Sequence, residues 1–321
     1  PQLALQRKLL PELKEFHPYI RPPLYAFVMA PFALLPLVPA FWIWLCAQVA
    51  GLLACWTWAC HRFGSDALVY CSFYLPAAYG IMHGQDNAAM LALLIAAFVL
   101  AGYETTFTAG AVLGLGLVKF HLLLLFPLVM LAGKRWRMLA GFALAGVVEA
   151  VLSLFLVGPE ALRQYYDLLR HNDPAAVIRW TMISLPVLPL NFGSNSPLWT
   201  AALVAAAVAL TLLACWRAPL WRWFSAAAVG SVLISPHAYK YDATMLLLPL
   251  LLAIFVSTAK STRLIAATAV IPIPYLIAVL GPPFAALPAV LFIAFLSALA
   301  RESYIELRPP KAIPQSLPVA A

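Results

Sequence analysis

The sequence is poor in charged residues. Asp, Glu, Lys and Arg make up 10% of its 321 residues, whereas soluble domains contain roughly 25%. Twelve acidic and twenty basic side chains are too few to cover a soluble protein of this length. This shortage excludes a soluble enzyme, and the abundance of apolar residues excludes a disordered chain.

Cysteine pairs, metal-ligand sets and internal repeats are also lacking. The five cysteines show no CxxC spacing and are interpreted as small apolar residues of the hydrophobic segments. The histidines are scattered and no DxD pair occurs, so neither a metal nor a cofactor is predicted. Lys and Arg do not cluster on a soluble face. The net charge of +8 therefore indicates cytoplasmic loops and membrane lipids as partners, and not nucleic acid.

Apolar sequence is abundant instead, at 64% of the residues and in continuous runs. Continuous runs indicate helices, because the strands of an outer-membrane barrel alternate apolar and polar residues. We predict an all-α polytopic membrane protein whose residues 1–321 form a single transmembrane domain of about ten spans. The candidate apolar segments are 24–36, 37–60, 66–82, 87–102, 106–118, 120–132, 138–157, 198–216, 223–236, 243–258, 264–280 and 284–300.

The stretch 106–132 is predicted to be a broken pair of short helices. As one continuous helix it would carry Lys119 to the bilayer centre and place Lys134 outside, against the preference of cytoplasmic loops for Lys and Arg. As two short helices, 106–118 and 120–132, it enters and returns on the same side with Lys119 at the vertex. Such a vertex is tolerated where protein or a wet cavity surrounds it.

With this break, loop charge places most of the polar sequence on one side of the membrane. The extracytoplasmic stretches are then 1–23, His83–Asn87, the loop 158–197 and His237–Asp242, and the tail 301–321 is cytoplasmic. The loop 158–197 is long, and loops of that length without regular structure are usually functional or flexible. We therefore expect the chemistry to lie on the extracytoplasmic side.

The first polar cluster is the sequence HGQDN, which contains His83, Gln85, Asp86 and Asn87 between two apolar segments. One interpretation is a helix N-cap, in which Asp86 or Asn87 binds the free N–H groups at the start of 87–102. A cap needs one such residue, however, and this cluster has four polar side chains. The alternative is a binding site for a ligand with many hydroxyls or a phosphate.

The second polar cluster is SPHAYKYD, with His237, Tyr239, Lys240, Tyr241 and Asp242 at the end of an apolar segment. It could be an interfacial anchor, in which the aromatic rings lie at headgroup level and Lys240 pairs with Asp242 or with lipid phosphate. The functional interpretation is a phosphate site in which Lys240 and His237 donate charge-assisted hydrogen bonds.

Three further positions are candidates. Lys119, with His121 beside it, either extends to the interface or is itself the cation that binds an anionic ligand. Arg21 precedes a double proline, which fixes an extended backbone at the mouth of the outer cavity. Glu149 lies inside an apolar segment, where an acid is a functional candidate by default, and it could equally pair with Lys119.

Four sequence blocks, taken in order, are RPPLYAFVMAPFALLPLVPAFWIWL, HGQDNAAMLALLIAAFVLAG, TAGAVLGLGLVKFHLLLLFPLVMLAGKRW and LISPHAYKYDATMLLLPLLL. In order and spacing, over most of 20–260, they resemble glycosyltransferase family 87, which contains polyprenol-phosphate-mannose-dependent mannosyltransferases. Two positions depart from the family pattern. Arg21 stands where the family often has Tyr, and His121 follows Lys119 where Thr-Pro or similar is common.

The resemblance implies a GT-C-type helical bundle in the bacterial plasma (inner) membrane. Such an enzyme moves a hexose, typically mannose, from a polyprenyl-phosphate donor to a lipid or glycan hydroxyl with inversion. It needs a base for the acceptor proton and donors or positive charge for the leaving phosphate. The family's acid lies in the first outer loop, and the corresponding stretch here either precedes Pro1 or is represented only by Glu12 and Glu15. We therefore expect the chain to lack its N-terminal part and its base.

The site residues that follow from this resemblance fall into three groups. The catalytic candidate is His237. The donor phosphate would be bound by Lys119, Lys240, His121 and Arg21. The sugar or the acceptor would be bound by His83, Gln85, Asp86, Asn87, Tyr241 and Asp242.

Two other functions remain open from the sequence. A transporter or lipid-linked-sugar flippase also uses broken helices with buried charge, but the sequence shows no internal symmetry. A structural subunit would not need four polar groups on one side of the membrane.

Overall fold

The computed structural model describes residue 8 and residues 20–171 and 181–307. Most of the segment 1–23, the middle of the stretch 158–197 and most of the tail 301–321 therefore lie outside the described residues. Within the described ranges every regular element is a helix, and the extended structure amounts to one isolated bridge between Met182 and Tyr239. The prediction of an all-α protein is confirmed.

The N-terminal half contains helices of very different length. They are α2 (Pro23–Met29), η1 (Ala30–Leu34), α3 (Leu37–Phe63), α4 (Asp66–Phe73), α5 (Leu75–Met82), α6 (Asn87–Gly102), α7 (Thr106–Gly114), η2 (Leu115–Leu122), α8 (Leu125–Ala132) and α9 (Trp136–His171). The label η marks a 3₁₀ helix.

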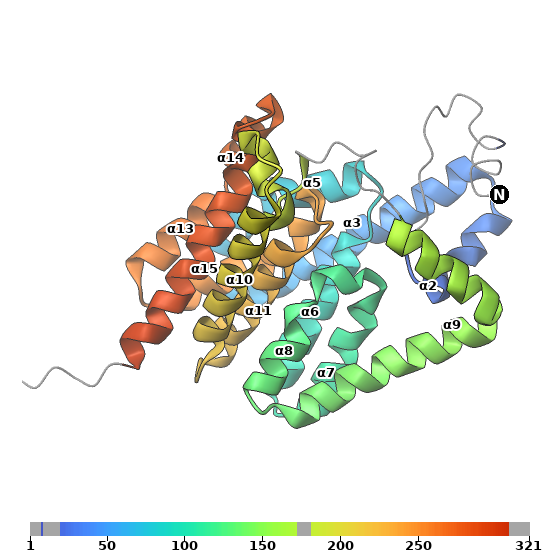
Figure 1. Cartoon of the computed structure of the whole chain (residues 1–321), viewed down its shortest axis with the longest axis horizontal. Helices are drawn as coiled ribbons and strands as arrows, with labels where there is room; N and C mark the ends of the chain where they lie inside the picture. The colour runs from blue at the N-terminus through green and yellow to red at the C-terminus, as the bar shows by residue number, and fades with distance from the viewer. Residues whose placement is uncertain (1–7, 9–19, 172–180, 308–321) are drawn as a thin grey trace, which may run out of the picture.

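The C-terminal half begins with η5 (Leu185–Phe192) and continues with α10 (Pro197–Cys215), α11 (Leu220–Ile234), η6 (Lys240–Leu246), α12 (Leu247–Val256), α13 (Lys260–Val270), α14 (Ile273–Ile277), η7 (Ala278–Leu280), η8 (Phe284–Ala286) and α15 (Leu287–Glu306). In Figure 1, α10, α11, α13 and α15 form one group, and α6, α7, α8 and the long α9 form another.

Fewer helices can span a membrane than the sequence predicts. Four described helices are long and apolar enough, beginning at Leu37, Trp136, Pro197 and Phe284, or up to five if the bent pair α13–α14 is one span. Several other apolar helices, among them α6 and α11, have 10–17 residues. At about 1.5 Å per residue they fall short of a hydrocarbon core of about 30 Å. The number of about ten was therefore too high, because breaks inside apolar runs are hard to see in the sequence.

The predicted loop 158–197 and the predicted tail 301–321 both contain helix. Helix α9 is broken by a kink at Gly158, which has non-helical backbone angles (φ 75°, ψ 169°), and it resumes from Pro159 to His171. Most of the start of the stretch 158–197 is therefore helical. The segment 185–192 adds the 3₁₀ helix η5. The tail predicted to begin at residue 301 starts inside α15, which ends at Glu306.

The core lies around α11 and α12. Every residue of α11 from Arg222 to Leu233 is buried, and so is every residue of α12 from Leu247 to Ile254. A helix that is apolar on all sides belongs in the centre of a bundle. By contrast, α3 and α9 expose many large apolar side chains. In an apolar stretch of 18 residues, only 11% of α3 and 22% of α9 is buried. These exposed faces suit contact with lipid.

The predicted break in 106–132 is confirmed. Lys119 has non-helical backbone angles (φ −120°, ψ 53°) between α7 and α8. A Cβ atom on Gly110 would collide with the carbonyl of Met138, while Gly146 lies against Leu117 further along both helices. Helices α7 and α9 therefore run in the same direction, and α8 between them must return. The GxxxG pair Gly110 and Gly114 permits this close packing.

Candidate functional site

Four segments that are far apart in the sequence meet around the ammonium group of Lys119. They are the backbone before α2, the loop 83–86 with the start of α6, the break in η2, and the segment 237–242 that leads into η6. The Lys119 side chain is 2% exposed. A lysine at this depth requires anionic partners.

Two carboxylates supply that partnership. The Nζ atom of Lys119 lies 2.9 Å from Oδ1 of Asp86 and 3.0 Å from Oδ1 of Asp242. It also donates a hydrogen bond to the side-chain carbonyl of Asn87. The three N–H groups of the Lys119 ammonium are all engaged, so its side chain is held in one position. From the break in 106–132, Lys119 thereby connects the start of α6 to η6.

Arg21 forms the outer side of this ionic group. Its Nη2 atom lies 2.9 Å from Oδ1 of Asp86 and donates to Oε1 of Gln85 at 3.4 Å, while its guanidinium lies over the ring of Tyr25. The side chain is 18% exposed, and its buried Nη1 atom has no hydrogen-bond partner. This NH2 group, with both of its N–H bonds, is therefore an unpartnered donor in the structure.

The Asp86 carboxylate is strongly held in its charged form. Burial raises its pKa, but the charges of Lys119 and Arg21 lower it more, and the pKa falls to about 2. Asp86 immediately precedes α6, yet its side chain makes no capping hydrogen bond to that helix. The interpretation of HGQDN as a simple N-cap is therefore wrong for Asp86, because the carboxylate serves the two cations instead.

The polar groups at the start of α6 and η6 are tied to each other. Asn87 donates from Nδ2 to the backbone carbonyl of Tyr241 at 2.6 Å. The second oxygen of Asp242 accepts the backbone N–H of Tyr239 at 3.0 Å, so this carboxylate is fixed on both sides. Asp242 therefore orients Lys119 while its own position is set by the backbone.

Two of the three predicted site histidines, His121 and His237, are neighbours beside this ionic group. The rings of His121 and His237 meet edge to face at 5.9 Å, and His237 also packs against Tyr239 at 4.9 Å. Burial lowers the pKa of His237, the negative charge of Asp242 opposes that shift, and the positive charges of Arg21 and Lys119 reinforce it. His237 is therefore neutral at pH 7, and a neutral imidazole can accept a proton.

Aromatic rings cover the same site. Tyr239 and Tyr241 stack at 5.3 Å, and Lys119 lies over the Tyr241 ring at 5.8 Å. The exposed His83 contacts Tyr241 at 5.6 Å and hydrogen-bonds the carbonyl of Tyr79 through Nδ1. His83 is thus at the rim, apart from the ion pairs.

The structure does not join every predicted residue to this group. Lys240, which the resemblance assigns to the donor phosphate, donates a hydrogen bond to the carbonyl of Ala278 in η7 at 3.2 Å. Glu149 does not pair with Lys119, whose anionic partners are Asp86 and Asp242.

Sequence reasoning missed the segment 182–188, which closes one side of the site. Met182 pairs with Tyr239 in the isolated bridge, and Ile183 donates its backbone N–H to the carbonyl of Ala238 at 2.8 Å. Met182 and Val187 pack with Tyr239 in one small apolar cluster. These residues are apolar and give no chemical signal in the sequence.

Among the described residues, no three or more His, Cys, Asp and Glu side chains are grouped so that they could hold a metal ion. The carboxylates Asp86 and Asp242 instead face the ammonium of Lys119. The arrangement offers a charge-balanced ionic group, the unpartnered guanidinium NH2 of Arg21 and the neutral imidazole of His237, which together suit an anionic ligand and proton transfer.

Comparison with protein families gives one match. The model of glycosyltransferase family 87 matches residues 19–236, which is more than half of the chain and includes Arg21, Asp86 and Lys119. Searches of curated proteins and of solved structures gave no match.

Proposed function

Because the chain belongs to glycosyltransferase family 87, we propose that it transfers a hexose, most simply mannose, from a polyprenyl-phosphate donor to a hydroxyl of a lipid or glycan. The family and the apolar helices identify a membrane glycosyltransferase. The donor, the acceptor and an extracytoplasmic site in the bacterial plasma membrane are the proposed part. A transporter or flippase is the alternative, and family membership favours the transferase.

The observation that carries the proposal is the convergence of four segments on Lys119, with Arg21 at the edge of the group. Two carboxylates already balance the charges of Lys119 and Arg21. The ionic group therefore contributes a rigid frame, and the phosphate would bind at the free Nη1 of Arg21 and beside the imidazoles. Donors fixed before the reaction stabilise a leaving anion without reorganisation.

In the proposed reaction, the acceptor oxygen forms a bond to C1 of the hexose while the bond between C1 and the phosphate oxygen breaks. The polyprenyl phosphate leaves with the bonding electron pair, close to Arg21 and Lys119. The acceptor proton passes to a base. His237, which is neutral at pH 7 because burial lowers its pKa, is the candidate within the described chain.

The test is sugar transfer by the full chain in membranes, with polyprenyl-phosphate mannose as donor and polyprenyl-phosphate glucose and a nucleotide sugar as comparisons. We expect transfer from a polyprenyl-phosphate donor and not from the nucleotide sugar. His237→Ala should lower transfer by at least about 100-fold, the usual contribution of a proton-transfer group. His61→Ala is the matched control, because His61 is exposed in the last turn of α3.

Two results would count against the proposal. Transfer from the nucleotide sugar alone would show that the donor is a nucleotide sugar and not a polyprenyl-phosphate sugar. Full activity in His237→Ala, with the protein expressed at the normal level, would remove His237 from the site.

A further inference from the structure

Glu149 is a carboxylate that the proposed mechanism does not use. It is partly buried in α9, within the candidate membrane span Trp136–Arg170. Within the described part of the chain it makes no ion pair or hydrogen bond, in contrast to Asp86 and Asp242. An ionisable side chain in a membrane-spanning segment is costly, so its presence without a partner needs an explanation.

The neighbours of Glu149 along α9 show where its side chain points. Ala145 lies against Gly114 of α7, and Gly146 lies against Leu117 of η2. Residues three and four apart share one face of a helix. Glu149 is therefore on the face of α9 that packs against α7 and η2, one turn further along.

The next turn on the same face reaches the other side of the site. The Ser153 hydroxyl accepts the backbone N–H of Leu24 at 3.2 Å, and Leu24 is three residues after Arg21. Tyr165 of α9 donates to the carbonyl of Ile20 at 3.1 Å. Helix α9 thus holds the backbone on both sides of Arg21, and Figure 1 shows α2 beside the far half of α9.

Glu149 consequently lies on α9 between Gly146, which contacts η2, and Ser153, which contacts the segment that follows Arg21. Lys119 and His121 lie in η2, and Arg21 precedes the other segment. Glu149 is only partly buried as a residue, so packing does not fully enclose it. We infer that Glu149 binds hydroxyl groups of the acceptor substrate, opposite the cationic side where the donor phosphate binds.

This assignment rests on the proposed function and names the class of acceptor. A lone carboxylate accepts hydrogen bonds from hydroxyl groups and repels an anionic headgroup. The acceptor would therefore present a neutral, polyhydroxylated headgroup, such as a sugar, near Glu149. Separation of the negative donor phosphate from the carboxylate keeps like charges apart and lets the two substrates bind on different sides.

The experiment compares Glu149→Gln and Glu149→Ala with the wild-type chain in the same membranes. Transfer is measured as a function of acceptor concentration at saturating donor, with a neutral glycoside acceptor. We expect the acceptor KM to rise by about 10-fold to 100-fold, the loss associated with a hydrogen bond to a charged group. The kcat and the donor KM should stay at the wild-type values.

The matched control is Glu160→Gln, because Glu160 is an exposed acid of the same helix whose contact is with Gln164. It should leave all three parameters unchanged. Glu149→Gln keeps the size of the side chain, so it remains informative if the alanine variant is unstable.

The outcomes separate the two proposals. A wild-type chain without transfer from a polyprenyl-phosphate donor would overturn the proposed function and this assignment with it. If the wild type is active, an unchanged acceptor KM in both Glu149 variants would overturn the assignment alone. A fall in kcat at constant KM would also overturn it, because that pattern belongs to a group that acts in the transition state.

Discussion

Two buried ionic groups lie in different parts of the molecule and are built differently. Around Lys119, one cation stands between two carboxylates that come from separate segments, next to breaks in helices. Around Arg222, one cation of α11 faces two carboxylates of a single helix, Glu302 and Glu306 of α15. Both pair charge, but the first is assembled from irregular backbone and the second from regular helices.

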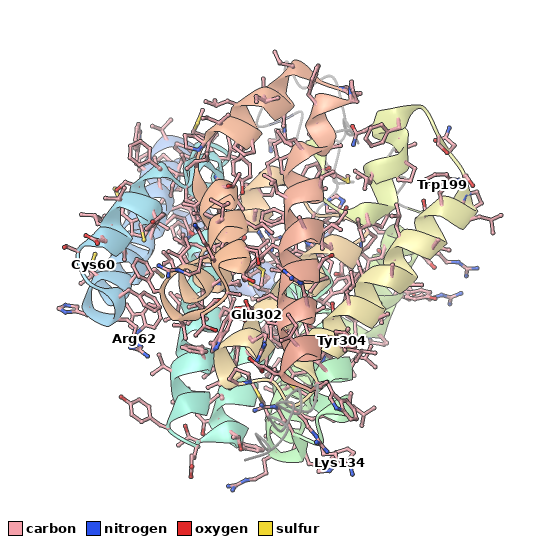
Figure 2. The ribbon with its side chains drawn as sticks, turned by 90° about the vertical axis from the view of Figure 1, so that its left-hand side faces the viewer. Cys60, Arg62, Lys134, Trp199, Glu302 and Tyr304 are labelled. Atoms are coloured by element: carbon pink, nitrogen blue, oxygen red, sulfur yellow. The ribbon has the colours of Figure 1, made fainter. Side chains whose placement is uncertain are left out.

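The Arg222 group is a packing contact. Its Nη1 atom is 3.7 Å from Glu302, which also accepts a hydrogen bond from Ser257 at 2.7 Å, while Glu306 is largely exposed. Figure 2 shows Glu302 among the helices in the centre of the view, whereas Arg62 and Lys134 lie towards the periphery. The group joins α11 to α15 and has no neighbouring imidazole among its described contacts. An unused donor does not separate the two groups, because Nε and Nη1 of Arg222 also lack hydrogen-bond partners. The comparison teaches that a buried ion pair indicates a ligand site when it lies at helix breaks and beside imidazoles.

The largest effect should come from Lys119→Met. This change leaves Asp86 and Asp242 buried without their shared cation, which costs about 3–5 kcal/mol of stability. It also removes charge beside the leaving phosphate, so transfer should fall by at least about 100-fold. Thermal unfolding in detergent and the transfer assay measure the two effects. Lys119→Arg restores the charge and is the control. Activity of Lys119→Met near the wild-type level would mean that the group is structural, like the one around Arg222.

Arg222→Met tests the other side of the comparison and should have a smaller effect. Glu302 loses its cation, but it keeps Ser257 as a donor, and Glu306 is 60% exposed and returns to solvent. We expect a loss of about 2–3 kcal/mol, below the range for a fully buried pair. Transfer per folded molecule should remain at the wild-type level. A specific loss of transfer without a loss of stability would show that the two groups are coupled.

The same contrast explains what the sequence could predict. Helix class, the start of α6 at Asn87 and the break at Lys119 followed from apolar runs and from loop charge. The burial of Arg222 did not, because this residue lies between the predicted apolar segments 198–216 and 223–236, whereas the structure buries it completely in α11. Loop charge describes topology and contains no information about which cations have partners.

The candidate site was partly accessible from sequence for a physical reason. Polar clusters such as HGQDN stand out against an apolar background, so their members were easy to find. The pairing of these residues was not easy to find, because Asp86 and Lys119 are 33 positions apart and no local sequence pattern reports that contact. For the same reason Lys240 was grouped with the phosphate site, although its ammonium contacts Ala278 in η7.

The smallest predicted effect is a dependence of stability on pH that belongs to the Lys119 group alone. Burial lowers the pKa of His237 in the folded protein and lowers that of His121 to about 4, so the unfolded chain binds protons first as the pH falls. Stability should therefore decline as the pH drops below 6.5 towards the folded pKa. Asp86, with a pKa of about 2, stays charged throughout, so the ion pairs of the group persist. Thermal unfolding between pH 7.5 and 5.5 measures the decline. It should be weaker in His237→Gln and unchanged in Arg222→Met, whereas an equal decline in His237→Gln would assign it to another group.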